Sequence, residues 1–184
     1  MHIAAVRGNS ISGGLSPNNN KRTEVFFAGC KKAAEGNPCP GCFNSVLWDN
    51  NDFANITPSE LFSCIDEENN KYVTIVGGEP MDQYEDLVTV LRQLHDSEYH
   101  TVVITHYKMD YIKQYFCKIL EYCNVIIDGE YDKEKRIFET DRTPGIYHVI
   151  GSSNQKIWHK NKYSKEWSVV DKNLTKEILK AYSE

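Results

Sequence analysis

The sequence predicts an α/β fold with a mostly parallel sheet. Four short apolar runs, rich in Val, Ile and Phe, alternate with three segments whose apolar residues recur at helical spacing. Such an alternation is typical of right-handed crossovers between parallel strands. The length of 184 residues fits one compact domain and is too short for a complete eight-fold β/α barrel, which typically takes about 250 residues.

The first strand and the first helix each have a local signal. The strand is predicted at Thr23–Ala28, after the polar loop Pro17–Asn20. Thr57 can cap the helix, Pro58 suits its first position, and Glu60 stands where a capping-box carboxylate reaches back. One apolar face follows, made of Leu61, Phe62, Cys64 and Ile65. The sequence therefore predicts an amphipathic helix from residue 58 onward.

The remaining elements of the α/β pattern follow in order along the chain. Strands are predicted at Tyr72–Val76, Thr101–Thr105 and Val125–Ile127. Helices are predicted between them, with apolar faces formed by Leu87, Val88, Leu91 and Leu94 in the first and by Ile112, Tyr115, Phe116, Ile119 and Leu120 in the second.

After Pro144 the pattern changes. Short strands are expected at Tyr147–Ile150 and Lys156–Trp158, on either side of the turn Gly151–Gln155. Beyond Lys160 the tail is charged, and it predicts a hairpin followed by a helix. That helix has one apolar face, formed by Leu174, Ile178 and Leu179.

The composition excludes several classes of function. The chain has 21 Lys and Arg against 26 Asp and Glu, a net charge of −5 with no long basic run, which argues against general nucleic-acid or anionic-membrane binding. No apolar stretch approaches the roughly 18 residues that a membrane span needs. The start, Met1–Arg7, is too short for a signal-peptide core. We therefore expect a cytoplasmic protein whose six cysteines are reduced thiols or metal ligands.

Three cysteines stand on one polar loop after the first strand. Cys39 and Cys42 are spaced to bind one metal centre, and Cys30 can reach the same centre across the loop. A structural zinc normally has four protein ligands, and the fourth could be His95 or His106, although neither has the local spacing of a zinc knuckle. An iron–sulfur cluster held by three thiolates would instead leave one iron open for an outside ligand. The spacing alone leaves zinc, a cluster and no metal as open alternatives.

The other three cysteines show a different pattern. Cys64 lies on the apolar face of its predicted helix. Cys117 and Cys123 are six residues apart, which places them about 240° apart around a helix. They cannot chelate as a pair unless that helix breaks, so all three are predicted to be small core residues.

Polar clusters recur where the predicted strands end. The cysteine loop follows the first strand, Gly77–Pro80 the second, His106-Tyr107 the third and Asp128–Glu130 the fourth. In parallel α/β sheets the carboxyl ends of the strands meet at the edge where ligands bind. Several independent segments therefore predict one shared site.

With these segments, the sequence resembles the radical S-adenosylmethionine (SAM) enzymes, and among them the activating proteins of anaerobic (class III) ribonucleotide reductases. The resemblance covers roughly residues 1–159 in order. The segments that carry it are Phe26–Cys30, Cys39–Asn44 with Trp48 after it, Gly77–Pro80, Thr105–Tyr107, Val125–Tyr131 and Gly151–Gln155. It implies a partial, open β/α barrel over residues 1–159 and a C-terminal extension, 160–184, of unknown role.

The resemblance also implies a cofactor and a reaction. Cys30, Cys39 and Cys42 would bind three irons of a [4Fe–4S] cluster that reduces SAM to methionine and a 5′-deoxyadenosyl radical. That radical would take a hydrogen atom from a glycine of a large partner, the anaerobic ribonucleotide reductase. An external one-electron donor such as flavodoxin or ferredoxin would supply the electron.

Seven further residues are placed at the cluster and SAM by the same resemblance. Gly77, Gly78 and Glu79 would receive the methionine end of SAM, with Glu79 offering a carboxylate to its amino group. The others, which would lie beside the cluster and the cofactor, are Gly41, Phe43, Asn44 and Thr105.

One departure from the family pattern bears on the substrate. The family spaces its cysteines Cys-x3-Cys-x2-Cys, whereas eight residues, Lys31–Pro38, separate Cys30 from Cys39 here. The extra residues either bulge outward at modest entropic cost or contact a different partner. Two alternatives therefore stay open: a radical SAM enzyme acting on a small molecule, as a deazapurine-forming synthase does, and a structural zinc or redox-sensing module.

Overall fold

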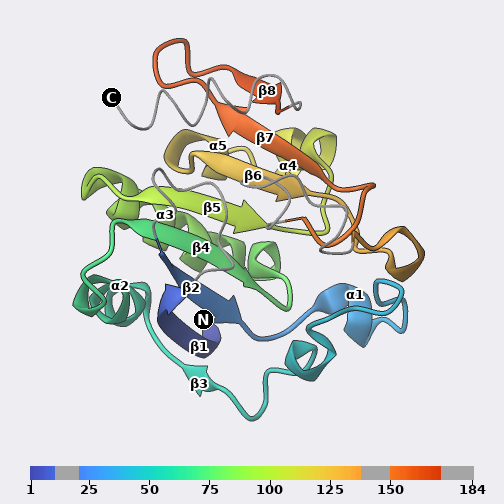
Figure 1. Ribbon diagram of the computed structural model, residues 1–184. Helices are drawn as coiled ribbons and strands as arrows, with labels where there is room; N and C mark the ends of the chain where they lie inside the picture. Colours follow the sequence, from blue (N-terminus) through green and yellow to red (C-terminus); the bar gives the residue numbers. More distant parts are fainter. Residues whose placement is uncertain (11–20, 138–149, 171–184) are drawn as a thin grey trace.

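The computed structural model describes residues 1–10, 21–137 and 150–170, and their strands form one eight-stranded sheet (Figure 1). The strand order is β3-β1-β2-β4-β5-β6-β7-β8. The strands are β1 (His2–Ser10), β2 (Arg22–Phe27), β3 (Ala54–Asn55), β4 (Tyr72–Gly77), β5 (His100–Ile104), β6 (Val125–Asp128), β7 (Lys156–Lys160) and β8 (Trp167–Val169). The α/β class that the sequence predicts is confirmed.

The expectation of a mostly parallel sheet is wrong. The central strands β2, β4, β5 and β6 run parallel, which makes three parallel ladders. The four ladders on the two flanks, β3–β1, β1–β2, β6–β7 and β7–β8, are antiparallel. The alternation of strands and helices in the sequence predicts only the parallel strands at the centre of the sheet, because each pair of these is joined by a crossover helix. Antiparallel strands can be joined without a helix, so this pattern does not predict the flanks.

Helices cover one face of this sheet. They are α2 (Pro58–Glu67), α3 (Tyr84–Asp96), α4 (Met109–Tyr115) and α5 (Ile119–Tyr122). The short helix α1 (Lys31–Ala34) lies instead in the loop that follows β2. The short 3₁₀ turns are η2 (Ser45–Leu47), η3 (Pro80–Gln83) and η4 (Lys133–Lys135). Helix α3 contacts α2, α5 and strand β5, and it lies behind the sheet in Figure 1. No helix in the described ranges is long and apolar enough to cross a membrane.

The two faces of the sheet contribute to two separate apolar clusters. Val103 and Ile126 join the large core under the helices, while Val102 and Val125 belong to a smaller cluster with Ile157. Because successive side chains of a strand point to opposite faces, neighbours in β5 and β6 divide between the clusters. The central strands are therefore buried on both sides, which explains why they are continuous apolar runs in the sequence.

The capping signal at Thr57 is confirmed. The Thr57 hydroxyl accepts a hydrogen bond from the Glu60 backbone N–H at 3.3 Å, and the Glu60 carboxylate accepts one from the Thr57 N–H at 2.7 Å. Helix α2 then buries Leu61 and Ile65. Cys64 is exposed, so its assignment to the core is wrong: Leu61 and Ile65, four residues apart, already fill the buried stripe.

The single helix predicted from Ile112 to Leu120 is broken. Helix α4 ends at Tyr115, and α5 begins at Ile119. Cys117 lies in the turn between them and is exposed, which corrects its assignment to the core, whereas Cys123 is buried as predicted. The apolar spacing continues across the break because both short helices pack on the same core.

Other segments differ from expectation or lie outside the description. Strand β1 pairs with β2, and the register shifts at two places. The apolar residues of β1 do not alternate regularly with polar ones, so the sequence does not predict this strand. The predicted strand Tyr147–Ile150 and the predicted C-terminal helix lie outside the described residues, apart from Ile150 itself. The hairpin beyond Lys160 is confirmed, since β8 pairs antiparallel with β7.

A buried arginine joins the amino ends of the parallel strands. Arg22 is fully buried, and its guanidinium donates to the Thr74 hydroxyl at 2.8 Å and to the Val73 carbonyl at 2.6 Å. It also reaches the carbonyl of His100 at 3.1 Å and lies 3.2 Å from the Nδ1 of the same residue. Burial, followed by the charges of Arg22 and His159, holds the pKa of His100 well below its ordinary value.

This environment predicts an acid-sensitive fold. Below about pH 6.5 the unfolded chain binds a proton at His100 that the folded protein does not, so the free energy of unfolding falls by up to about 1.4 kcal/mol per pH unit. The substitution His100→Asn should flatten this slope, as measured by urea denaturation of the apo protein between pH 7.5 and 5.5. The exposed His95→Asn is the control and should keep the wild-type slope. Identical slopes in all three proteins would contradict the assignment.

Candidate functional site

Three cysteines, Cys30, Cys39 and Cys42, line one pocket at the carboxyl ends of the parallel strands. The pocket has a volume of about 190 Å³. It is also lined by Phe43, Asn44, Trp48, Val76, Gly77, Gly78, Glu79, Ile104, Thr105, His106, Gly129, Tyr131, Gly151 and Gln155. The structure thus brings together the segments that follow four central strands, as the strand-end argument predicts.

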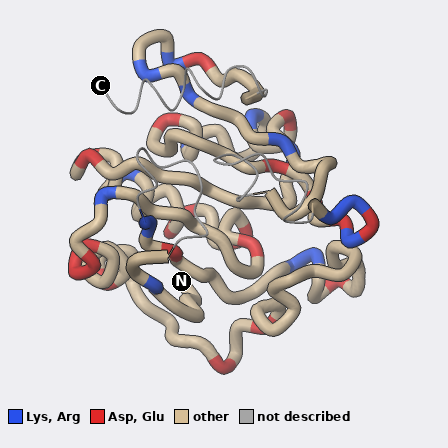
Figure 2. Tube along the Cα trace, viewed as in Figure 1, with Lys and Arg blue, Asp and Glu red and all other residues tan. Residues whose placement is uncertain are grey.

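Of the ten residues that the resemblance places at the cluster and SAM, Gly41 alone does not line this pocket. Its φ is +67°, and a Cβ there would lie 2.8 Å from the side chain of Lys133, which places it against the η4 turn. The Lys133 N–H donates to the Pro40 carbonyl at 3.1 Å, so η4 supports the outer side of the cysteine loop. Figure 2 shows that basic and acidic residues are mixed along this turn.

Sequence reasoning missed several pocket residues as members of the site. Val76 and Ile104 stand near the ends of predicted strands, which is the signal that could have found them. Trp48, Tyr131 and Gln155 belong to segments that carry the family resemblance, but no spacing in the sequence assigns them a place.

The thiols of the pocket are half-buried. Burial raises the pKa of Cys39 to about 11, although the backbone N–H of Tyr131 partly opposes the shift. Burial also raises the pKa of Cys30, against a hydrogen bond from the Ala33 backbone. Metal binding at these residues would therefore release protons, because the ligand is the thiolate.

The donor set fits an iron–sulfur cluster. Clusters are held by cysteine thiolates, each bound to a different iron, and three such donors face one cavity here. Within the described ranges, no three His, Cys, Asp or Glu side chains are arranged to hold a single metal ion. The residues present thus provide soft sulfur ligands spread around a cavity.

Two glycines allow the cysteine loop to lie against the end of β4. The N–H of Gly78 donates to the Phe27 carbonyl and that of Glu79 to the Gly29 carbonyl, both at 2.8 Å. A Cβ on Gly77 would collide with the backbone of Phe27, and one on Gly78 with the Gly29 carbonyl. Gly77 also has a φ of +133°, which side chains rarely permit. Both glycines are therefore required by packing between backbones.

The Glu79 carboxylate is buried and fully hydrogen-bonded. One oxygen accepts from the Met81 N–H at 3.0 Å and from the Thr105 hydroxyl at 2.8 Å. The other accepts from the His106 N–H at 2.9 Å and lies 2.6 Å from its Nδ1. Burial lowers the pKa of His106, but the hydrogen bond and charge of Glu79 outweigh it and raise that pKa. Glu79 thus joins the ends of β4 and β5.

The rim of the pocket is aromatic. Asn44 donates to the Gly77 carbonyl at 2.9 Å, which ties the cysteine loop to the turn after β4. Phe43, the residue before Asn44, is 56% exposed. The centre of its ring lies 4.5 Å from that of Tyr131, and the Arg136 guanidinium lies over the Phe43 ring, 4.9 Å from its centre. A Cβ on Gly151 would lie only 3.0 Å from the ring of Tyr131. A glycine at position 151 therefore leaves room for this ring.

The turn before β7 closes the far side of the pocket. The Gln155 carboxamide accepts from the Gly151 N–H at 2.9 Å and donates to the Gly129 carbonyl at 3.0 Å. Asn154 donates to the Glu130 carbonyl at 2.7 Å. Both amides attach the turn to the segment that follows β6. Asp128, in contrast, faces helix α4, where it accepts the Met109 N–H at 2.7 Å.

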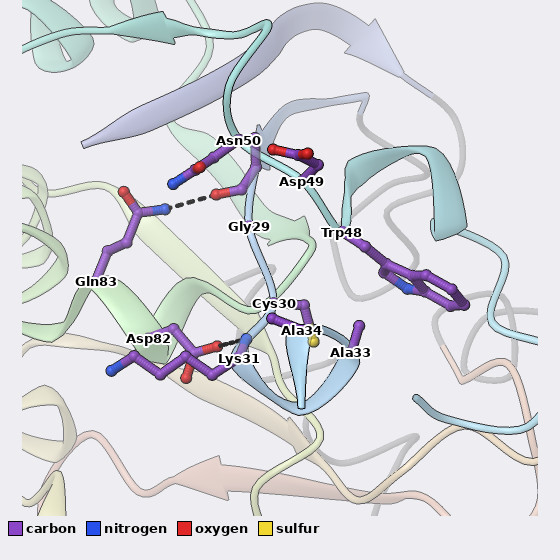
Figure 3. A pocket seen from close by; sticks show the side chains of 11 residues that line it. Gly29, Cys30, Lys31, Ala33, Ala34, Trp48, Asp49, Asn50, Asp82 and Gln83 are labelled. Atoms are coloured by element: carbon purple, nitrogen blue, oxygen red, sulfur yellow. Dashed lines mark hydrogen bonds between the residues drawn. The ribbon is translucent and has the colours of Figure 1, made fainter. Parts of the chain in front are cut away.

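A second cavity lies on the other side of Cys30. It has a volume of about 430 Å³, and Figure 3 shows the residues that line it. Cys30 and Trp48 line both cavities. Lys31, Ala33 and Ala34, from the long segment between the first two cysteines, form one of its walls. The first half of the segment between Cys30 and Cys39 therefore forms α1 and contributes to this cavity.

Sequence comparison agrees with the ligand set. Residues 19–158 match the 4Fe-4S single cluster domain family. The chain therefore belongs to this family. The cofactor of this protein is accordingly a 4Fe-4S cluster. The region that matches the family contains every residue that lines the cysteine pocket.

Two relatives of this 4Fe-4S protein carry a more specific name. The anaerobic ribonucleoside-triphosphate reductase-activating protein of Enterobacteria phage T4 is 29% identical over 145 residues, which are 74% of this chain and 83% of the phage protein. The protein of the same name from Salmonella typhimurium (strain LT2) is 24% identical over 147 residues, covering 75% of this chain and 88% of that protein.

The backbone contact at Gly78 yields a prediction. The substitution Gly78→Ala forces the ends of β2 and β4 apart, and overpacking of this kind costs about 1–3 kcal/mol. We expect a lower urea midpoint and several-fold less iron bound per chain after anaerobic reconstitution. The control is Gly36→Asn, since a Cβ at Gly36 meets nothing within 4 Å and Asn tolerates its φ of +78°. Equal iron binding by the two variants would refute the role of Gly78.

Proposed function

We propose that this protein is a radical SAM activase that generates a glycyl radical on an anaerobic ribonucleotide reductase. The observation that carries the proposal is the convergence of three cysteines and the Gly77–Glu79 turn on one pocket. The names of the two relatives support the choice of partner. When bound here and reduced by one electron from an external donor, the cluster would pass that electron to SAM, giving methionine and a 5′-deoxyadenosyl radical that would take a hydrogen atom from a glycine of the reductase.

In this proposal the chain's own residues hold and orient the reactants. Cys30, Cys39 and Cys42 bind three irons and leave the fourth open to the amino and carboxylate groups of SAM. The backbone at Gly77 and Gly78 receives the methionine end of SAM. For Glu79 to bind the amino group, its carboxylate would exchange the contact with His106 for one with the ligand.

Phe43, Asn44 and Thr105 complete the proposed SAM site. Asn44 and Thr105 are both hydrogen-bonded to the turn after β4, so they hold the cavity in shape. The exposed ring of Phe43 gives the rim an apolar surface for the cofactor. Gly41 acts from outside the pocket, because its small size lets η4 lie on the cysteine loop.

The proposal includes the form of the domain and its setting. Residues 1–159 form an open radical SAM barrel, and its open side admits a loop of the large reductase. The extension from residue 160 contributes β8 to the edge of the same sheet. The reaction takes place in the cytoplasm, with a flavodoxin or ferredoxin as electron donor.

Anaerobic reconstitution with iron and sulfide tests the proposal. The wild-type protein should bind about four irons, give a reduced-cluster signal that changes when SAM is added, and form 5′-deoxyadenosine. Alanine at Cys30, Cys39 or Cys42 should reduce 5′-deoxyadenosine formation to background, because each removes a proposed ligand. The exposed cysteine variant Cys64→Ala is the matched control and should behave as wild type.

Each alternative has its own outcome in the same experiment. Failure of SAM to perturb the cluster signal, with no 5′-deoxyadenosine, would sink the activase. Formation of 5′-deoxyadenosine without a glycyl radical on an added anaerobic ribonucleotide reductase would favour a small-molecule substrate. A colourless protein that holds about one zinc, and whose Cys30→Ala variant loses stability, would favour a structural zinc module.

A further inference from the structure

The turn that follows Glu79 holds the segment around Cys30 from both sides. In this turn, η3, the Asp82 carboxylate accepts the Lys31 N–H at 2.6 Å, directly after Cys30 (Figure 3). Its neighbour Gln83 donates to the carbonyl of Ala28, two residues before Cys30, at 2.9 Å. Two consecutive side chains therefore fix the backbone on either side of the first cysteine.

The two side chains differ in charge and in their other partners. The second Asp82 oxygen accepts the Tyr107 hydroxyl at 2.9 Å, so three loops meet at this carboxylate. Gln83 is neutral and accepts the His2 N–H at 2.6 Å. Asp82 forms no ion pair with any described residue. Its charge acts on the groups around it, since it helps to raise the pKa values of Cys30 and His106.

We infer that Asp82 is a positioning residue for Cys30 whose fixed charge also lowers the reduction potential of the bound cluster. The inference rests on Cys30 as a cluster ligand, part of the proposed function. Reduction adds one electron from an external donor to the cluster, so the cluster becomes more negative by one charge. A carboxylate held beside one of its ligands opposes that added charge, and the reduced cluster is then a stronger reductant.

The arrangement makes Asp82 and Gln83 separable by experiment. Both support the same backbone, so a purely structural role would affect both alike. Only Asp82 has a charge, so only its neutralisation should change the cluster's electron affinity. The Lys31 N–H can still bond to the amide oxygen of an asparagine, which keeps the geometry of Cys30 in the variant Asp82→Asn.

The test is a redox titration of the reconstituted full-length protein without SAM, followed by the electron paramagnetic resonance of the reduced cluster. Asp82→Asn should be reduced about tenfold more readily than wild type, which for one electron is a shift of about 59 mV to more positive potential. Asp82→Glu should return the potential toward wild type. Gln83→Ala should lower the urea midpoint and leave the potential unchanged.

Tyr107→Phe provides a second check on the sign. It removes a hydrogen bond that partly balances the Asp82 charge, so the potential should stay the same or fall. A potential in Asp82→Asn equal to wild type, at equal iron content, would overturn the inference. So would an equal positive shift in Asp82→Asn and Asp82→Glu, or a wild-type protein that forms no cluster. Because SAM is absent, a failure of SAM cleavage would refute the proposed activase and leave this comparison standing.

Discussion

The contact between the backbone segments that follow β2 and β4 is the constraint on which the rest of the site depends. Two hydrogen bonds, from Gly78 to Phe27 and from Glu79 to Gly29, fasten the start of the cysteine loop to the end of its neighbouring strand. A side chain at Gly77 or Gly78 would collide with that backbone. Because Cys30 directly follows Gly29, this contact fixes where the first thiol lies.

From this contact the site extends across the sheet through buried polar groups. Glu79 carries the connection to the end of β5 through Thr105 and His106. A buried carboxylate with four contacts is costly to disturb, since each lost partner would leave a desolvated group unpaired. The pocket wall formed by these residues is therefore preorganised before any ligand enters.

The antiparallel flanks supply what the parallel centre cannot. Because β7 runs opposite to β6, the turn Gly151–Gln155 that precedes it returns to the end of β6 and closes the pocket there. Because β1 runs opposite to β2, its start lies beside Ala28, where Gln83 contacts both segments. A fully parallel sheet would leave both of these edges open. Asp82 lines the second cavity and accepts the Lys31 N–H directly after Cys30.

The sequence by itself determined the features that depend on short-range patterns: the capping box at Thr57, the central strands, and the three cysteines with their strand-end partners. Only the tertiary structure decided the antiparallel flanks, the break before Cys117 and the exposure of Cys64. It also decided that Glu79 is engaged by Thr105 and His106 and that Asp82 touches Lys31. The Glu79 and Asp82 contacts join residues 26 to 51 positions apart. Local periodicity in the sequence does not predict such contacts, because they form only when separate elements pack together.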